Sequence, residues 1–406
     1  MSKLTVKNFG PLKDIDIELN NINLFVGENG SGKSVLAKLI TIILDLYSIS
    51  NVDVNGFMKK LEEYNINFVT DDTAIKYYNK EVILFELKNG NISKNDLLKL
   101  QEIHKEILLN KYDIDTERDK INQRLEEINN FKQNGLSSEE LKKIENIELE
   151  INNDLTRWNK LSERILNTED RLLKLTSQYI PAERNLISIF NKYVTTFITA
   201  DIPLPKFLLN FSSQYIRARE EIKELGFLNV KYKFKNEQEC IYYNDNDYLL
   251  LEQSSSGIQS VLPLYLTVKY FSSKHESIII EEPEQNLFPK AQSETIKYIV
   301  EQIADENRLF MMTHSPYILS TLNNLIYAYI VAELGEEEKK KVKEIINEKQ
   351  WINPKSFSAY YIEDGKARSI VSDIGLISDN VIDDISEEMG EEFDELLEIY
   401  RVSKNG

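Results

Sequence analysis

A glycine-rich segment near the amino terminus has residue types and spacing that bind phosphate. Its sequence, GENGSGKS, runs from Gly27 to Ser34 and follows the pattern G-x-x-x-x-G-K-S. Glycines let backbone N–H groups turn inward around a polyphosphate, and the following helix points its positive end at the same anion. We expect Lys33 to reach the terminal phosphates and the Ser34 hydroxyl to bind Mg²⁺. The other residues expected to contact the nucleotide are Glu28, Asn29, Gly30, Ser31 and Gly32.

Two acidic residues follow an apolar run in the second half of the chain. Ile278–Ile280 precede Glu281 and Glu282. A β-branched run of this kind is typical of a central parallel strand, and α/β sheets bind ligands beyond the carboxyl ends of such strands. We expect Glu281 to hold Mg²⁺ and Glu282 to orient or deprotonate the attacking water. Two glutamates alone would indicate only a strand that ends in solvated acids, but the phosphate loop favours the catalytic interpretation.

A histidine ends the next apolar strand pattern, LFMMTH, at residues 309–314. A histidine at a strand end of the same sheet can donate a hydrogen bond to the γ-phosphate or to the attacking water. A lone histidine there would more often be structural. Together with the phosphate loop and the two glutamates, His314 is a candidate catalytic residue.

A second helix start with affinity for anions lies in the segment LEQSSSGIQSVLPLYL, residues 251–266. A polar Ser/Gly cluster precedes an apolar helix pattern, so backbone N–H groups and the positive helix end would face an anion. One chain with two such ends raises the question of what the second one binds. One answer is the nucleotide held by another copy of the chain.

The flanking segments alternate between strand and helix patterns. An apolar strand pattern precedes the phosphate loop and an apolar helix pattern follows it, at residues 22–26 and 34–47. Period-two alternation predicts further strands at 3–9 and 15–19, an antiparallel hairpin from 227–234 and 240–243, and a strand-turn-strand at 361–370. An acidic helix is predicted at 383–401. These patterns predict an α/β fold with mixed sheets.

Residues 93–178 differ in composition from the flanking segments, because they contain no proline and many charged residues. Apolar residues recur every seven positions in two series: Leu100, Ile107, Ile114, Ile121, Ile128, and Ile144, Ile151, Trp158, Ile165, Leu172. A turn pattern at Asn134–Gly135 and a capping box from Ser137 to Glu140 separate them. We predict an antiparallel coiled-coil hairpin with arms of about 45 Å; two amphipathic helices lying on the body are the alternative. The head would then comprise residues 1–95 and 178–406, and the hairpin 96–177.

Composition narrows the class of protein. The chain has 406 residues and a formal net charge of −18. This charge argues against a protein that binds nucleic acid through a mainly basic surface, but it is compatible with a local basic groove. The single cysteine, Cys240, is read as a packing residue and cannot form an internal disulfide, which suits a reducing cytoplasm. No apolar signal segment or membrane-spanning run is evident. We expect a cytoplasmic protein without a membrane anchor.

These motifs together resemble ABC-type ATPase heads of the SMC, RecF and OLD-nuclease branch, in particular the small bacterial AAA-type members. The phosphate loop matches the Walker A motif, Ser256-Gly257-Ile258-Gln259 resembles the signature motif, Ile280–Glu284 resembles Walker B, and His314 stands at the switch histidine. The opening residues 4–19 and YIPAER at 179–184 also resemble this branch. The resemblance implies a head-to-head homodimer, with higher oligomers left open, that clamps two ATP molecules with Mg²⁺.

The resemblance also assigns roles. Ser256, Gly257 and Gln259 would contact the nucleotide of the partner copy, and Glu282 would be the catalytic base. The chain departs from the commonest pattern at Ile258, where glycine is usual, and at Glu281, where aspartate is usual. Gln178 is a weak candidate for the Q-loop glutamine. The residue Arg184 is read as either a phosphate-side or a structural residue.

Three functions fit these motifs. The first is an ATP-driven switch that controls a separate effector, a nuclease or toxin, as in the ATPase subunits of anti-phage modules that the chain resembles. The second is a DNA-repair or chromosome ATPase that binds DNA across its heads, and the third is a scaffold that nucleotide locks into a dimer. About 90 residues follow His314 without an E…D-x-D metal set, so we expect no nuclease in this chain. Acidity and the short hairpin favour the switch over DNA binding.

Overall fold

The structure is a computed structural model of the chain, and it describes residues 2–45, 54–79, 82–92, 177–187, 204–274, 277–303 and 307–377. Contacts divide the chain into two units, Met1–Ser93 with Lys174–Gly406, and Lys94–Leu173. The heptad segments and the acidic segment 383–401 lie outside the described residues. The coiled-coil hairpin, its boundaries at 96 and 177, and the acidic helix therefore stay predictions.

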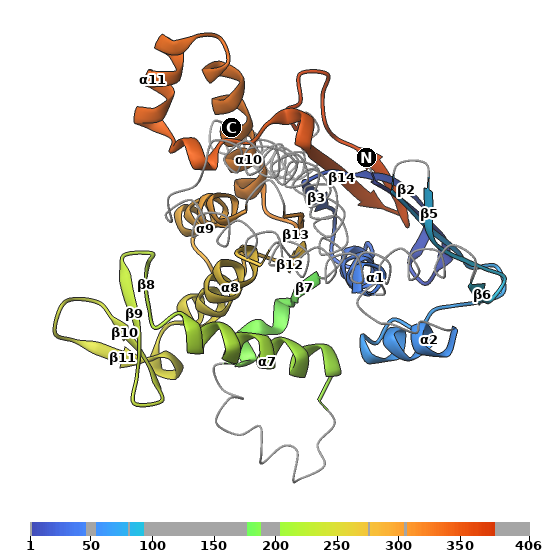
Figure 1. The fold of residues 1–406 in the computed structure, drawn as a ribbon, viewed down its shortest axis with the longest axis horizontal. Helices are drawn as coiled ribbons and strands as arrows, with labels where there is room; N and C mark the ends of the chain where they lie inside the picture. Colours follow the sequence, from blue (N-terminus) through green and yellow to red (C-terminus); the bar gives the residue numbers. More distant parts are fainter. Residues whose placement is uncertain are drawn as a thin grey trace, which may run out of the picture. The chain divides into compact units, whose positions relative to one another are not determined.

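The main element is an 11-stranded mixed sheet in the order β6-β5-β4-β1-β2-β15-β14-β3-β13-β12-β7 (Figure 1). Its antiparallel part comprises β1 (Ser2–Phe9), β2 (Leu12–Leu19), β4 (Ala74–Asn79), β5 (Val82–Lys88) and β6 (Asn91–Ile92). Its parallel part comprises β14 (Phe357–Glu363), β3 (Ile22–Val26), β13 (Leu309–Thr313), β12 (Ser277–Glu281) and β7 (Ser177–Ile180). Strand β15 (Lys366–Ser369) joins the two parts, antiparallel to β14 and parallel to β2. The predicted α/β fold with a mixed sheet is confirmed.

Burial follows from the position of each strand. In β1 and β2 buried and exposed residues largely alternate, as period-two geometry requires when one face meets the core. In β3, β12 and β13 every residue is buried. The reason is that helices cover both faces of this part of the sheet: in Figure 1, α1 (Lys33–Asp45) lies on one side of β12 and β13, and α8 (Ser256–Ser272), α9 (Pro289–Gln302) and α10 (Pro316–Ala332) lie on the other.

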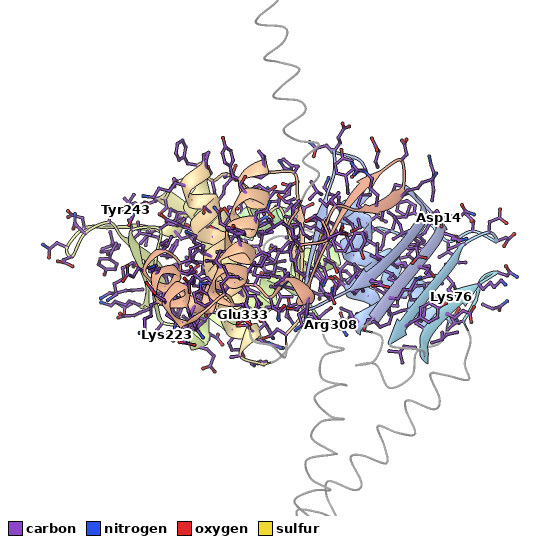
Figure 2. The ribbon with its side chains drawn as sticks, turned by 90° about the horizontal axis from the view of Figure 1, so that it is seen from above. Asp14, Lys76, Lys223, Tyr243, Arg308 and Glu333 are labelled. Carbon is purple, nitrogen blue, oxygen red and sulfur yellow. The ribbon has the colours of Figure 1, made fainter. Side chains whose placement is uncertain are left out.

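A small sheet and further helices complete the described part of the chain. The remaining helices include α2 (Val54–Glu63), α7 (Lys206–Glu221), which packs on α8, and α11 (Glu336–Ile345), which packs on α10. The small antiparallel sheet has the order β11 (Tyr248–Leu250), β10 (Gln238–Tyr242), β9 (Val230–Lys235), β8 (Glu224–Phe227). Figure 2 shows Tyr243 beside this sheet, and Asp14 and Lys76 on the antiparallel part of the main sheet. Among the described residues, no helix is long and apolar enough to cross a bilayer.

Two predicted strand pairs can be compared directly with the structure. The strand-turn-strand at 361–370 is confirmed as the end of β14, a turn at Asp364–Gly365, and β15. The hairpin of β9 and β10 is confirmed as well. The prediction of one continuous strand over 227–234 is wrong, because Leu228 and Asn229 have φ values of 43° and 63°. Left-handed residues of this kind form a tight hairpin turn, and the segment is divided between β8 and β9.

Candidate nucleotide site

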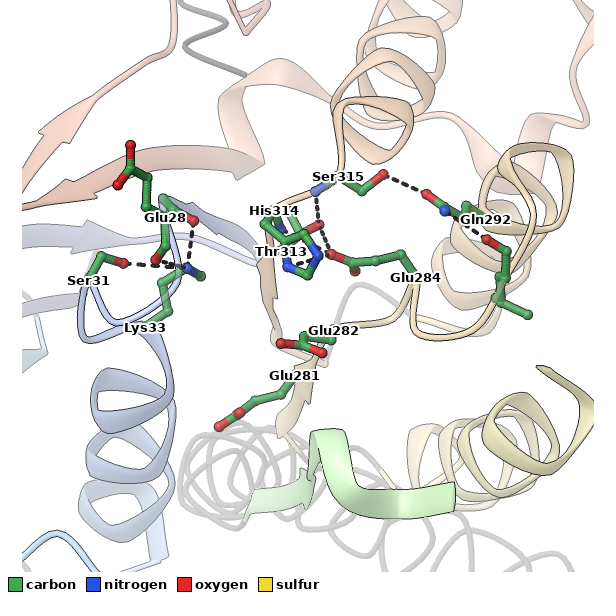
Figure 3. A network of polar contacts seen from close by, with 12 residues as sticks. Glu28, Ser31, Lys33, Glu281, Glu282, Glu284, Gln292, Thr313, His314 and Ser315 are labelled. Carbon is green, nitrogen blue, oxygen red and sulfur yellow. Dashed lines mark hydrogen bonds and ion pairs between the residues drawn. The ribbon is translucent and has the colours of Figure 1, made fainter. Parts of the chain in front are cut away.

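The phosphate loop connects β3 to α1 and is closed by its own lysine. The Lys33 Nζ atom donates to the carbonyl oxygens of Gly27 and Glu28, at 2.6 and 2.7 Å. It also lies 3.4 Å from Ser31 Oγ, and Figure 3 shows these contacts. Burial lowers the pKa of Lys33, while nearby carboxylates, Glu282 first among them, favour the protonated form. The loop therefore holds a positive charge in place where a polyphosphate would bind.

Glycine at position 32 satisfies a steric requirement of this loop. Gly32 has a φ of 102°, and a Cβ atom there would lie 2.9 Å from the Leu12 side chain. The left-handed conformation and the close approach of β2 together favour glycine. The hairpin of β1 and β2 thus packs directly against the loop.

The expected magnesium ligands meet across the site. Ser34 Oγ donates to Glu281 Oε2 at 2.8 Å, so α1 and the end of β12 are joined. The other carboxylate oxygen, Oε1, accepts from the hydroxyl of Tyr179 at 2.6 Å. Burial raises the pKa of Glu281, and the hydrogen bonds from Tyr179 and Ser34 act in the opposite direction. A hydroxyl and a carboxylate at this spacing are oxygen donors that suit Mg²⁺.

Glu282 stands just beyond β12 in a strained backbone conformation. Its φ is 45°, and the left-handed region costs a non-glycine residue roughly 1–2 kcal/mol. The backbone N–H of Glu282 donates to the Met312 carbonyl at 2.9 Å, which fixes the turn to the end of β13. Figure 3 shows its carboxylate between Glu281 and His314. Strain at a residue in this position is typical of functional sites.

Glu284 has no individual role predicted from the sequence, yet it organises the histidine. Its Oε1 atom accepts from the Thr313 hydroxyl at 2.7 Å and from the His314 backbone N–H at 3.0 Å, and it lies 3.5 Å from His314 Nδ1. The Glu284 side chain is 5% exposed and that of His314 is 46% exposed. Glu284 therefore anchors the backbone of His314 and lies beside one nitrogen of the imidazole, while the ring stays open toward solvent. The third glutamate of EEPE is the only sequence signal that points to it.

The signature segment, Ser256–Gln259, opens helix α8. The Ser255 side chain caps the helix by accepting from the Ile258 N–H, and Ser256 is exposed. A Cβ atom on Gly257 would lie 2.8 Å from the backbone oxygen of Asn286, so only glycine fits there without displacement. The Gln259 amide donates to the carbonyls of Glu252 and Ser254, at 3.1 and 2.8 Å.

The structure brings some predicted site residues together and keeps others apart. The phosphate loop, both glutamates and His314 lie around one edge of the sheet, at the carboxyl ends of β3, β12 and β13. Strands β12 and β7 lie between α1 and α8 in Figure 1. The signature segment packs on the turn after β12, where a Cβ atom on Gly257 would meet the Asn286 carbonyl. Gln178 lies within β7 opposite Ile278. Of the two roles open to Arg184, the structural one holds, because the side chain is fully buried and donates to backbone carbonyls.

A cavity beside the loop offers room for the rest of a nucleotide. It has a volume of about 420 Å³ and is lined by loop residues 28–31, by Pro11 and Lys13, and by residues 361–365 of β14 and the following turn. The phosphate loop forms one wall of the cavity. The cavity is the space beside the loop in which we expect the nucleoside to lie.

Comparison with known proteins adds a family match. The family model described as AAA ATPase domain matches residues 1–319. One similar solved structure is that of the Smc head domain with an extended coiled coil, bound to the C-terminal domain of ScpA and derived from Pyrococcus furiosus. The match has a TM-score of 0.31 and 10% sequence identity, and it covers 91% of this chain and 96% of that chain. The Smc head domain with a coiled coil and joint from Pyrococcus yayanosii has a TM-score of 0.37 and 10% identity, with coverage of 95% and 100%. No curated protein matches the sequence.

Proposed function

We propose that this chain, which belongs to the AAA ATPase domain family, is a molecular switch that binds ATP with Mg²⁺ and hydrolyses its γ-phosphate. The observation that carries the proposal is the 2.8 Å hydrogen bond between Ser34 and Glu281. It joins the phosphate loop to the acidic strand end, so that both elements face the same phosphates. A steady-state assay of phosphate release from ATP tests the proposal; absence of turnover in the wild-type chain with Mg²⁺ contradicts it.

The side chains have distinct roles in this proposal. Lys33 and the backbone N–H groups of the loop bind the β- and γ-phosphates, and Ser34 with Glu281 would hold Mg²⁺, which neutralises phosphate charge when bound. Glu282 orients the attacking water and accepts its proton. His314, held by Glu284, donates a hydrogen bond to the transferred phosphoryl group or to the water.

A second copy of the chain would complete the site. Ser256 is exposed, and with Gly257 it forms the first turn of α8, whose positive end favours an anion. We infer that this segment binds the γ-phosphate held by the partner copy, so that ATP closes a homodimer and hydrolysis releases it.

Replacing Ser256 with arginine is expected to abolish ATP-dependent pairing while ATP binding is kept. The long side chain would fill the space that the γ-phosphate needs, and stability should not change because Ser256 is exposed. Sedimentation measures the pairing and nucleotide titration measures the binding. Exposed Ser273, at the other end of α8, provides the matched control variant Ser273→Arg. Normal pairing of Ser256→Arg would contradict the assignment.

Replacing Tyr179 with phenylalanine is expected to weaken binding of Mg²⁺–ATP by roughly tenfold, the effect of one lost hydrogen bond to a charged group. The Tyr179 hydroxyl helps to keep the pKa of Glu281 down against burial, so its loss raises that pKa further. More Glu281 is then protonated at a given pH, and the deficit should grow as the pH falls and shrink as it rises. ATP titration with Mg²⁺ at several pH values, below and above neutral, measures the effect. A deficit that does not vary with pH would mean that the Tyr179 hydroxyl acts by orienting the Glu281 carboxylate and not through its pKa.

We further propose that closure and opening of the pair control a separate effector protein, a nuclease or toxin, in cytoplasmic anti-phage defence. The support is the joint resemblance of the motifs and the predicted hairpin between the two head segments. Purification of the tagged chain with ATP, followed by mass spectrometry, should recover a protein that Lys33→Ala does not retain. Recovery of DNA that is released at high salt, without such a protein, would favour the DNA-binding alternative.

A further inference from the structure

A buried arginine contacts both the acidic strand end and the signature helix. Arg184 lies in the short helix Ala182–Leu186 that follows β7, and it is 0% exposed. Burial lowers its pKa to about 10, so the guanidinium is charged at neutral pH. A buried charge is costly unless all its donors are used, and the contacts of this side chain explain how it is accommodated.

The guanidinium donates to backbone oxygens of three segments. Two of its nitrogens donate to the carbonyls of Glu281 and Glu282, at 2.7 and 2.6 Å. The Nε atom donates to the carbonyl of Ser260 in α8 at 3.1 Å. A further hydrogen bond of 3.1 Å reaches Pro181 in its own turn. Only a planar group with several fixed donors can span these carbonyls at once.

The two elements joined by Arg184 also touch each other directly. Ser260 Oγ donates to Gln285 Oε1 at 3.2 Å, and the Gly257 Cα hydrogen faces the Asn286 carbonyl, where a Cβ would lie 2.8 Å away. The start of α8 and the segment 281–286 therefore form one packed unit. Displacement of the start of α8 would be transmitted to the strained turn at Glu282.

We propose that Arg184 is a positioning residue that couples the signature helix to the catalytic turn of the same chain. This inference rests on the proposed function, in which α8 binds the partner's nucleotide and Glu282 acts on the chain's own nucleotide. When the partner's γ-phosphate engages Ser256, Arg184 holds Glu282 in its active position. Binding of nucleotide at the partner's site would then affect hydrolysis at the chain's own site through the Arg184 guanidinium.

The test compares turnover with pairing in the full-length chain. Arg184→Lys keeps the charge but cannot reach all the carbonyls, so it is expected to pair with ATP at the same protein concentration as the wild type, with kcat lowered about tenfold or more and KM within about twofold. Arg308→Lys is the matched control, because Arg308 joins Tyr77 and Ser2 at the antiparallel part of the sheet (Figure 2). An Arg184→Lys dimer that turns over at the wild-type rate would overturn the inference, even if its melting temperature is lower.

A second variant covers the case in which Arg184→Lys does not fold. Arg184→Gln keeps a planar amide donor at this position and removes the charge and most of the contacts with the Glu281, Glu282 and Ser260 carbonyls. A fall in kcat of about tenfold or more with pairing retained is expected, and an unchanged kcat would overturn the coupling. Failure of the wild type to hydrolyse ATP or to pair would instead defeat the proposed function, so the two failures are distinguishable.

Discussion

The Lys33→Ala variant is expected to bind ATP at least about 100-fold more weakly than the wild type. Lys33 carries a charge at the start of α1, where the loop backbone and the helix end already favour an anion. Charge-assisted hydrogen bonds to phosphate contribute about 1.5–3 kcal/mol each, and about 2.7 kcal/mol corresponds to 100-fold in affinity. Calorimetric titration with a slowly hydrolysed ATP analogue measures the difference.

The Lys33 variant needs a control, because the same ammonium also holds the loop. Its contacts with the carbonyls of Gly27 and Glu28 mean that Lys33→Ala loosens the loop as well as removing the charge. The melting temperature of Lys33→Ala without nucleotide measures this loosening. Lys290→Ala, which removes a lysine whose side chain is 80% exposed on α9, should bind ATP normally. Wild-type affinity of Lys33→Ala would show that nucleotide does not bind in this loop.

The Glu282→Gln variant is expected to lose ATP turnover by about 10²–10⁴-fold, the usual contribution of a general base, while it still binds ATP and pairs. The amide has nearly the shape of the carboxylate but cannot accept the proton of water. Phosphate release measures the loss, and Glu337→Gln, on an exposed side chain of α11, is the matched control. Turnover at the wild-type rate would refute the assignment of Glu282 as the base.

Local sequence patterns were sufficient to predict the elements nearest the phosphate loop. The loop itself has fixed spacing, and the strands around it have apolar runs or period-two alternation, so the positions of β1, β2, β3 and α1 follow from the sequence alone. Glu281 and His314 were identifiable because each ends an apolar strand, and the carboxyl ends of parallel strands share one edge of a sheet.

The roles of the supporting residues could not be predicted in this way, because these roles depend on which strands become neighbours. Tyr179 reaches Glu281 since β7 pairs in parallel with β12, with Ile180 opposite Ile280, and 102 residues separate the two side chains along the chain. Arg184 and Glu284 depend on the same sheet order. No local pattern encodes that order, and no pattern predicted that β15 would join the two parts of the sheet.

The position of the signature segment shows a further limit of sequence reasoning. The pattern at 255–259 correctly predicted a capped helix start, but an anion-binding helix end does not indicate whose anion it binds. In the structure, Gln259 donates within its own loop, whereas Ser256 remains exposed. The assignment of this segment to a partner's nucleotide is therefore a proposal that the pairing experiments must decide.

Sedimentation equilibrium of Glu282→Gln with saturating ATP and Mg²⁺ tests whether ATP clamps two copies of the chain together. We expect a dimer that reverts to monomer when ATP is removed, and we expect Ser256→Arg in the same background to stay monomeric. A protein that remains monomeric with ATP demonstrably bound, or a dimer that Ser256→Arg leaves intact, would show that ATP does not pair the chains through the signature segment.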